Sequence, residues 1–278
     1  NTYRYILGNL YDFNPSEDAV KDYKKFLEID RWALSRCQVL LKKATQAYSD
    51  FSFYQIYHPV HNFCAVDMSS FYLDVLKDRL YTFAKGCNAR RSAQTVLYEI
   101  LLVLVKIMAP ILPYTSEEVW QYLPGKHREV SVHICQWPKV NEKWIDKDLE
   151  QAWQRLLEIR QAVCAALEQK RISKEIKSSL EAKVFLFTAG DEVYSFLQRY
   201  KEQLPAVFIV SDVELTAVKE MPADLEKFNA VKGLGIRIGR SDGLKCQRCW
   251  NWSKSVGEDE QYPGLCQRCR EVTGLLRS

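Results

Sequence analysis

The sequence has no apolar stretch long enough to cross a membrane, because its 278 residues contain no uninterrupted run of about 18 apolar side chains. The nearest candidate, Glu99 to Glu117, is interrupted by Lys106, Pro110 and Pro113. The first residues, Asn1-Thr-Tyr-Arg, contain neither an initiator methionine nor the apolar core of a signal peptide. We therefore expect a chain without a membrane span that is a fragment of a longer protein.

Motifs that carry catalysis are also missing. The chain has only 11 glycines and four histidines, and no glycine-rich phosphate loop, Ser/His/Asp arrangement or pair of carboxylates stands out. His58 and His61 form an H-x-x-H pair around Pro59, but no glutamate is placed as a third ligand or as a base. We expect no catalytic residue in this chain.

The charge is small but unevenly distributed. The net charge is +4, and residues 1–230 hold 30 basic and 30 acidic side chains, whereas residues 231–278 hold 9 and 5. Seven of the 11 glycines also lie in these last 48 residues. Both shifts predict a small separate module at the C-terminal end with some affinity for polyanions.

Nine cysteines are an odd number, which argues against a complete disulfide framework. Five are scattered through apolar segments and are interpreted as small buried side chains of a reducing compartment. These five are Cys37, Cys64, Cys87, Cys135 and Cys164.

The other four cysteines form two C-x-x-C pairs, Cys246-Gln-Arg-Cys249 and, sixteen residues later, Cys266-Gln-Arg-Cys269. This spacing is typical of a four-thiolate tetrahedral zinc site, which has no open coordination position and is therefore structural. We predict one Zn²⁺ per chain. The alternative is a pair of redox dithiols, which usually lie beside a βαβ pattern, and the sequence does not indicate such a pattern.

Cationic and aromatic side chains surround these cysteines, and the combination suits unpaired nucleotides. Arginines and lysines pair with phosphates, and bases stack on indole rings. Either tryptophan could instead cover the zinc site as part of a miniature core. The candidate RNA contacts in the tail are Lys245, Arg248, Trp250, Trp252 and Arg268.

Apolar periodicity predicts long helices over residues 24–48, 51–83, 90–109 and 146–170, with 90–109 the most apolar and therefore central. Thr115 and Glu118 have the spacing of a capping box that starts a short helix. Residues 130–136 alternate as a short extended segment. The predicted strands are Lys183–Thr188, Ala206–Val210, Asp212–Val218 and Leu234–Arg240, with a helix near Asp191–Tyr200.

These patterns predict a mainly α protein in three parts. Residues 1–140 would form an antiparallel helical bundle, residues 141–240 a small α/β junction domain, and residues 241–278 a four-cysteine zinc module.

Several segments then make the sequence resemble the C-terminal part of bacterial-type isoleucyl-tRNA synthetases, which belong to the class I aminoacyl-tRNA synthetases. The matching stretches run in order along nearly the whole chain. They include Asn1-Thr-Tyr-Arg-Tyr-Ile-Leu-Gly-Asn-Leu-Tyr-Asp-Phe-Asn-Pro15, Arg90-Arg-Ser-Ala-Gln-Thr-Val-Leu-Tyr98, Ala109-Pro-Ile-Leu-Pro-Tyr-Thr-Ser-Glu-Glu-Val-Trp120, Ser178-Ser-Leu-Glu-Ala-Lys-Val184 and Cys246–Arg270. The zinc tail is similar to the isoleucine member rather than to its valine and leucine relatives.

The resemblance implies a tRNA-recognition fragment that performs no chemistry itself. Its bundle would receive the anticodon stem of isoleucine tRNA, with Arg90 and Arg91 as candidate contacts, and the zinc module would bind the anticodon loop. Solvated helix ends are the alternative interpretation of these two arginines. The family's ATP-binding loops are absent here, so the resemblance assigns ATP to an upstream catalytic domain of the same polypeptide. It also implies a monomer in a bacterial cytoplasm or an organellar matrix.

Two other hypotheses stay open from the residues. One is a duplex-DNA-binding zinc module like that of formamidopyrimidine-type glycosylases, which would explain the tail but not residues 1–240. The other is a protein-interaction scaffold in which zinc only stabilises the C-terminal end, and which would bind no tRNA.

Overall fold

The computed structural model describes residues 1–125, 129–222, 225 and 231–275, and the chain divides into two compact units, Asn1–Gln151 and Ala152–Ser278. Helix α7 (Lys147–Ile172) begins in the first unit and continues into the second. Within the described ranges, no helix has both the length and the apolar composition that a membrane span requires.

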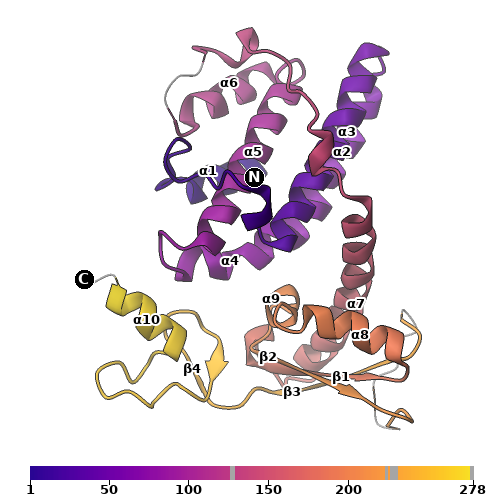
Figure 1. Ribbon diagram of the computed structural model, residues 1–278, viewed down its shortest axis with the longest axis vertical. Coiled ribbons are helices and arrows are strands. Elements are labelled where there is room, and N and C mark those ends of the chain that lie inside the picture. Colours follow the sequence, from indigo (N-terminus) through magenta and orange to yellow (C-terminus); the bar gives the residue numbers. More distant parts are fainter. Residues whose placement is uncertain (126–128, 223–224, 226–230, 276–278) are drawn as a thin grey trace. The chain divides into compact units, whose positions relative to one another are not determined.

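The first unit is a helical bundle whose long members are α2 (Glu28–Ser49) and α5 (Asn88–Met108) (Figure 1). These two helices run in the same direction, because Ser92 near the start of α5 donates to Asp30 near the start of α2, and Tyr48 near the end of α2 donates to the carbonyl of Ile107. The continuous segment of the π-helix η2 (Phe63–Tyr72) and helix α4 (Leu73–Thr82) runs antiparallel to α2, since Asp67 reaches Arg36 whereas Arg79, farther along, reaches Asp30. The other elements are α1 (Thr2–Asn9), η1 (Tyr23–Lys25), α3 (Tyr54–Asn62), α6 (Pro113–Tyr122), η3 (Val132–Ile134) and η4 (Glu142–Trp144).

Helix α5 forms the centre of this bundle, as its apolar sequence predicts. Val96, Leu97, Ile100 and Leu104 are fully buried, and they recur at the three- and four-residue spacing of one helix face. Helix α5 packs against α1, α2, α4 and α6. The central position predicted for residues 90–109 is therefore confirmed.

A buried charge network lies where α2, α4 and α5 meet. The carboxylate of Asp30 is completely buried and accepts hydrogen bonds from Arg79 Nη1 (3.0 Å) and Nη2 (2.7 Å), from the hydroxyl of Tyr72 (2.8 Å) and from that of Ser92. Burial, together with the neighbouring Asp30, raises the pKa of Tyr72, so its hydroxyl keeps the proton that it donates. A buried carboxylate is tolerated only with such a complete set of donors.

The second unit contains a three-stranded sheet in the order β2-β1-β3. Strand β1 (Ala182–Thr188) pairs parallel with β2 (Asp212–Ala217) and antiparallel with β3 (Leu234–Arg240), with Val184 opposite Val213 and Ile238. Alternate residues of β1 are buried, and helices α8 (Asp191–Tyr200) and α9 (Leu204–Phe208) pack against the sheet. The remaining elements are η5 (Ser179–Glu181), β4 (Leu244–Lys245), β5 (Trp252–Ser253) and α10 (Gln267–Leu275).

Three local predictions were wrong. Residues 204–208 form helix α9 rather than a strand, because Pro205 occupies its first turn and Ile209 ends it in the left-handed region (φ 57°). Helix α6 already begins at Pro113, so Thr115 and Glu118 lie inside it and form no capping box. The predicted extended segment contains the 3₁₀ turn η3, in which Ser131 accepts from the amide of His133.

We predict that Asp30→Ala destabilises the bundle by about 3–5 kcal/mol, because it leaves the buried Arg79 guanidinium without its counterion. Urea unfolding followed by circular dichroism measures this change. The control is Glu142→Ala, which removes an exposed ion pair with Lys42 (2.9 Å) and should change the free energy of unfolding by less than about 1 kcal/mol. Equal effects of the two substitutions would contradict the structural role of Asp30.

Candidate zinc centre and its cationic neighbours

Two local structures bring the four predicted zinc ligands together. Cys246 and Cys249 belong to the tight turn of the β4–β5 hairpin, where the amide of Trp250 donates to the carbonyl of Cys246 (3.0 Å). Cys266 directly precedes α10, and Cys269 lies in the first turn of that helix. We call residues 244–275, from β4 to the end of α10, the cysteine module.

The four sulfur atoms fit one tetrahedral metal ion. They lie within 4.8 Å of one another, and all four cysteines are buried. The Sγ atoms of Cys249 and Cys266 are 3.7 Å apart, and two thiolates on a tetrahedral zinc ion are about 3.8 Å apart. A set of four thiolates satisfies Zn²⁺ fully and provides no position for a substrate.

The same convergence argues against two separate redox dithiols, although one premise used against them was wrong. Strands β1 and β2 are parallel and are connected through α8 and α9, so the chain does contain a βαβ unit. Both C-x-x-C pairs lie outside it, and their sulfur atoms meet at a single point.

The sulfur atoms also interact electrostatically with one another. The pKa of Cys249 is lowered to about 4, chiefly because the thiol of Cys269 donates a hydrogen bond to its sulfur, and the pKa of Cys269 is raised because that proton is held between them. Burial also raises the pKa of Cys266, so without a metal part of the cluster keeps its protons, and binding of a divalent cation would release them.

Apolar packing contributes little to this module. Its buried cluster consists of the four cysteines and Val256, with Leu265 packed against them. Because so few apolar side chains are available, metal binding would supply most of the folding free energy of this part.

Arg248 lies against the sulfur cluster itself. Its guanidinium donates to Sγ of Cys269 at 3.7 Å, so the arginine faces a metal ligand as well as the surface. Arg268 is partly buried in the first turn of α10, and its charge helps to lower the pKa of Cys249.

Trp250 is the most exposed tryptophan of the module, at 60%. It has a positive φ of 65°, a conformation that favours glycine and is strained for a bulky side chain. The ammonium group of Lys245 lies 5.3 Å from its ring centroid. Trp250 therefore does not cover the sulfur cluster, and the miniature-core interpretation is wrong for it.

Trp252 has a different environment. It is partly buried at the start of β5, and its amide donates to the hydroxyl of Ser211 at 2.7 Å. Sequence reasoning missed Ser211, since a single serine before a strand gives no signal of this contact.

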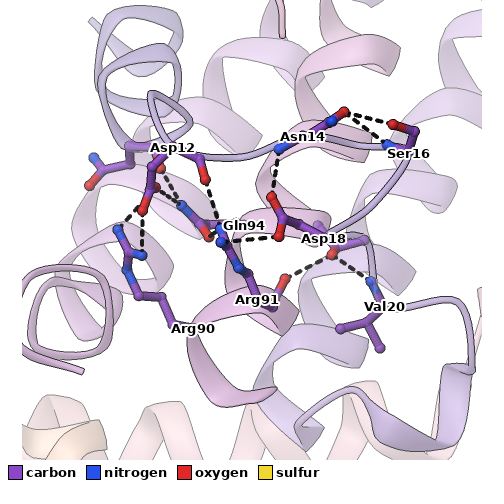
Figure 2. Close-up of polar contacts among 10 residues, drawn as sticks. Asp12, Asn14, Ser16, Asp18, Val20, Arg90, Arg91 and Gln94 are labelled. Carbon is purple, nitrogen blue, oxygen red and sulfur yellow. Dashed lines mark hydrogen bonds and ion pairs between the residues drawn. The ribbon is translucent and has the colours of Figure 1, made fainter. Parts of the chain in front are cut away.

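The structure places Arg90 and Arg91 inside the bundle (Figure 2). Arg90 is 3% exposed and forms two hydrogen bonds with the carboxylate of Asp12 (2.7 and 3.1 Å), whereas Arg91 pairs with Asp18 (3.1 Å). Gln94 also donates to Asp12, so all three side chains fasten the segment before α2 onto α5. The solvated-end interpretation is wrong for Arg90, and the tRNA contact of both arginines stays a prediction.

Two known protein families match this chain, one over the bundle and the start of the sheet and one over the cysteine module. Residues 30–186 match the anticodon-binding domain of tRNA ligases, and residues 243–272 match a zinc finger found in FPG and IleRS. The chain is 44% identical over 274 residues to the isoleucine–tRNA ligase of Moorella thermoacetica, and 46% and 45% identical to those of Syntrophotalea carbinolica and Geobacter sulfurreducens. The alignments cover 97–98% of this chain but only 28–29% of these relatives, so the chain spans less than a third of their length.

We predict one zinc per chain, and loss of that zinc in Cys246→Ser. The cysteine module should then unfold while the bundle keeps its helical signal and its melting temperature, because the two have separate cores. Elemental analysis and far-UV circular dichroism measure the two effects. Protein purified without chelator that contains no zinc would contradict the prediction.

Proposed function

The chain belongs to the family of anticodon-binding domains of tRNA ligases, and from this premise we propose that it is the tRNA-recognition part of an isoleucine–tRNA ligase. That enzyme would join isoleucine to its tRNA with ATP. Three parts would divide the work: residues 1–140 bind the anticodon stem, residues 141–240 form a junction, and residues 241–278 bind the anticodon loop. Residues 276–278 lie outside the described ranges.

The observation that carries the proposal is the exposed Trp250 on the cysteine hairpin. A strained conformation at a bulky exposed side chain points to a functional constraint, because glycine would adopt the same φ without strain. Zinc supplies rigidity to the turn when bound. The hairpin would then present the indole ring in a fixed position before RNA arrives, which lowers the ordering cost of binding.

Each neighbouring cation has a separate role in this proposal. Lys245 approaches the Trp250 ring and is exposed, so it can neutralise a phosphate next to a stacked base. Arg248 would contact the RNA while its guanidinium also donates to Sγ of Cys269, a proposed zinc ligand. Arg268 and Trp252 complete the set of proposed tRNA contacts in the tail. Arg90 and Arg91 are paired with Asp12 and Asp18, so they would contact tRNA only by exchanging these partners.

The rest of the enzyme would supply the chemistry. We propose that activation of isoleucine with ATP takes place in a catalytic domain of the same polypeptide, and that this chain contributes no catalytic residue. The proposal includes a monomer, located in a bacterial cytoplasm or an organellar matrix.

A duplex-DNA-binding module is the alternative, since the matching zinc finger also occurs in FPG proteins. It leaves the match of residues 30–186 without an explanation. Binding measurements with an isoleucine tRNA anticodon stem-loop and with a DNA duplex of equal charge separate the two. Preference for the duplex would overturn the proposed function, and absence of binding to either would favour a protein-interaction scaffold.

We predict that Trp250→Ala weakens binding of the stem-loop roughly 5- to 150-fold, the cost of about 1–3 kcal/mol for one lost stacked base. Trp250→Gly should weaken binding equally but leave the melting temperature of the zinc-loaded module unchanged or higher, because glycine tolerates the positive φ. The control is Leu244→Ala, which removes a 58% exposed apolar side chain from the same hairpin. Unchanged affinity in both Trp250 variants would mean that the tryptophan does not contact RNA.

We predict that the purified chain catalyses no isoleucine-dependent exchange of pyrophosphate into ATP, because it has no motif that could hold ATP phosphates. The assay is run on zinc-loaded protein beside a buffer blank. Exchange that survives extensive purification would show that the division of labour proposed here is wrong.

A further inference from the structure

Ser211 lies where three segments of the second unit meet, and it belongs to neither the sulfur cluster nor the proposed RNA contacts. It follows α9 and directly precedes β2. The left-handed Ile209 (φ 57°) reverses the chain at the end of α9, and the amide of Ser211 donates to the carbonyl of Ala182 (3.3 Å). The backbone therefore fixes Ser211 at the end of the sheet where β1 begins.

The hydroxyl of Ser211 makes two hydrogen bonds at the same time, one as a donor and one as an acceptor. It donates to the carbonyl of Leu180 at 2.5 Å and accepts from the amide of Trp252 at 2.7 Å. A hydroxyl has one hydrogen and two lone pairs, so the two contacts define its orientation. The amide of Trp252 belongs to β5, which pairs with β4 in a two-stranded sheet.

The connecting chain between β3 and β4 provides further contacts with the cysteine module and the sheet. The amide of Ser241 donates to the carbonyl of Glu181 (2.7 Å). Gly243, with φ 85°, makes the turn into β4, where a Cβ atom would lie 2.3 Å from the backbone of Ser253. These contacts lead the chain into the module, and Lys254, which directly follows β5, pairs with Asp242 of the connection (3.1 Å). The Ser211 hydroxyl adds a contact from the start of β2, a separate part of the sheet, to a backbone amide of β5.

We propose that the hydroxyl of Ser211 is a positioning residue that fixes the cysteine hairpin against the three-stranded sheet. The inference rests on the proposed function, because the position of the hairpin determines where Trp250 and Lys245 meet the anticodon loop. Without the hydroxyl, the module keeps its metal but loses its fixed orientation.

The test compares Ser211→Ala with Ser211→Thr, which retains a hydroxyl, in the complete zinc-loaded chain. The control is Ser178→Ala, which removes an exposed hydroxyl near the same junction that makes no capping bond at η5. Amide hydrogen exchange of Trp252 is the direct readout, and zinc content and stem-loop affinity are measured on the same samples.

In Ser211→Ala we expect exchange of the Trp252 amide to become at least about fivefold faster, one zinc per chain to remain, and stem-loop affinity to fall about 3- to 10-fold. Ser211→Thr should keep the exchange rate of the Trp252 amide and the stem-loop affinity of the unaltered chain, and Ser178→Ala should change neither.

Unchanged exchange in Ser211→Ala would overturn the positioning role. Faster exchange with unchanged affinity would overturn its link to RNA. If the unaltered chain binds no stem-loop, the proposed function fails, and the exchange measurement still decides whether Ser211 holds the hairpin.

Discussion

Four converging sulfur atoms take the place of an apolar core in the C-terminal part of this protein. The cysteine module buries Val256 and Val272 but few other large apolar side chains, so thiolate–metal bonds must stabilise its turns. The position of every other functional group in the module follows from this constraint. Trp250 directly follows Cys249, Arg248 directly precedes it, and Lys245 directly precedes Cys246. The ligands therefore fix the backbone from which the proposed RNA contacts extend.

The bundle depends on a different kind of interaction, in which buried cations are paired with carboxylates. Asp30 holds Arg79, and Asp12 holds Arg90. Arg36 is placed between Asp67 (3.0 Å) and Glu150 (3.2 Å), and burial raises the pKa of Asp67 against the opposing effect of Arg36. The pairs of Arg79 and Arg90 specify how the helices meet, because the loss of either carboxylate would leave a buried charge. They also occupy arginines that would otherwise attract phosphates.

The features that sequence reasoning predicted are those with strong local signals. Apolar periodicity located α2, α5 and α7, alternation located β1 and β3, and the spacing of the four cysteines located the metal site. The errors have local causes as well: residues 206–210 are rich in β-branched and aromatic side chains, but Pro205 and the tertiary environment favour a helix. The roles of Arg90 and Ser211 could not be predicted, because their partners lie 78 and 41 residues away along the chain. Spacing in a single sequence carries no information about such contacts.

Under the proposed function, the geometry around Trp250 would allow a chain with a net charge of only +4 to attract RNA at a defined place. Residues 1–230 are neutral overall, and arginines of the bundle such as Arg79 and Arg90 are paired with acids, so long-range attraction is concentrated at the tail. There Lys245 lies over the ring of Trp250, and a cation on one face of an indole leaves the opposite face for a base. A phosphate next to that base would be attracted by the same ammonium group. Stacking and charge neutralisation would thus come from two side chains whose backbone positions a single metal ion fixes, and these interactions would offset the strain at Trp250.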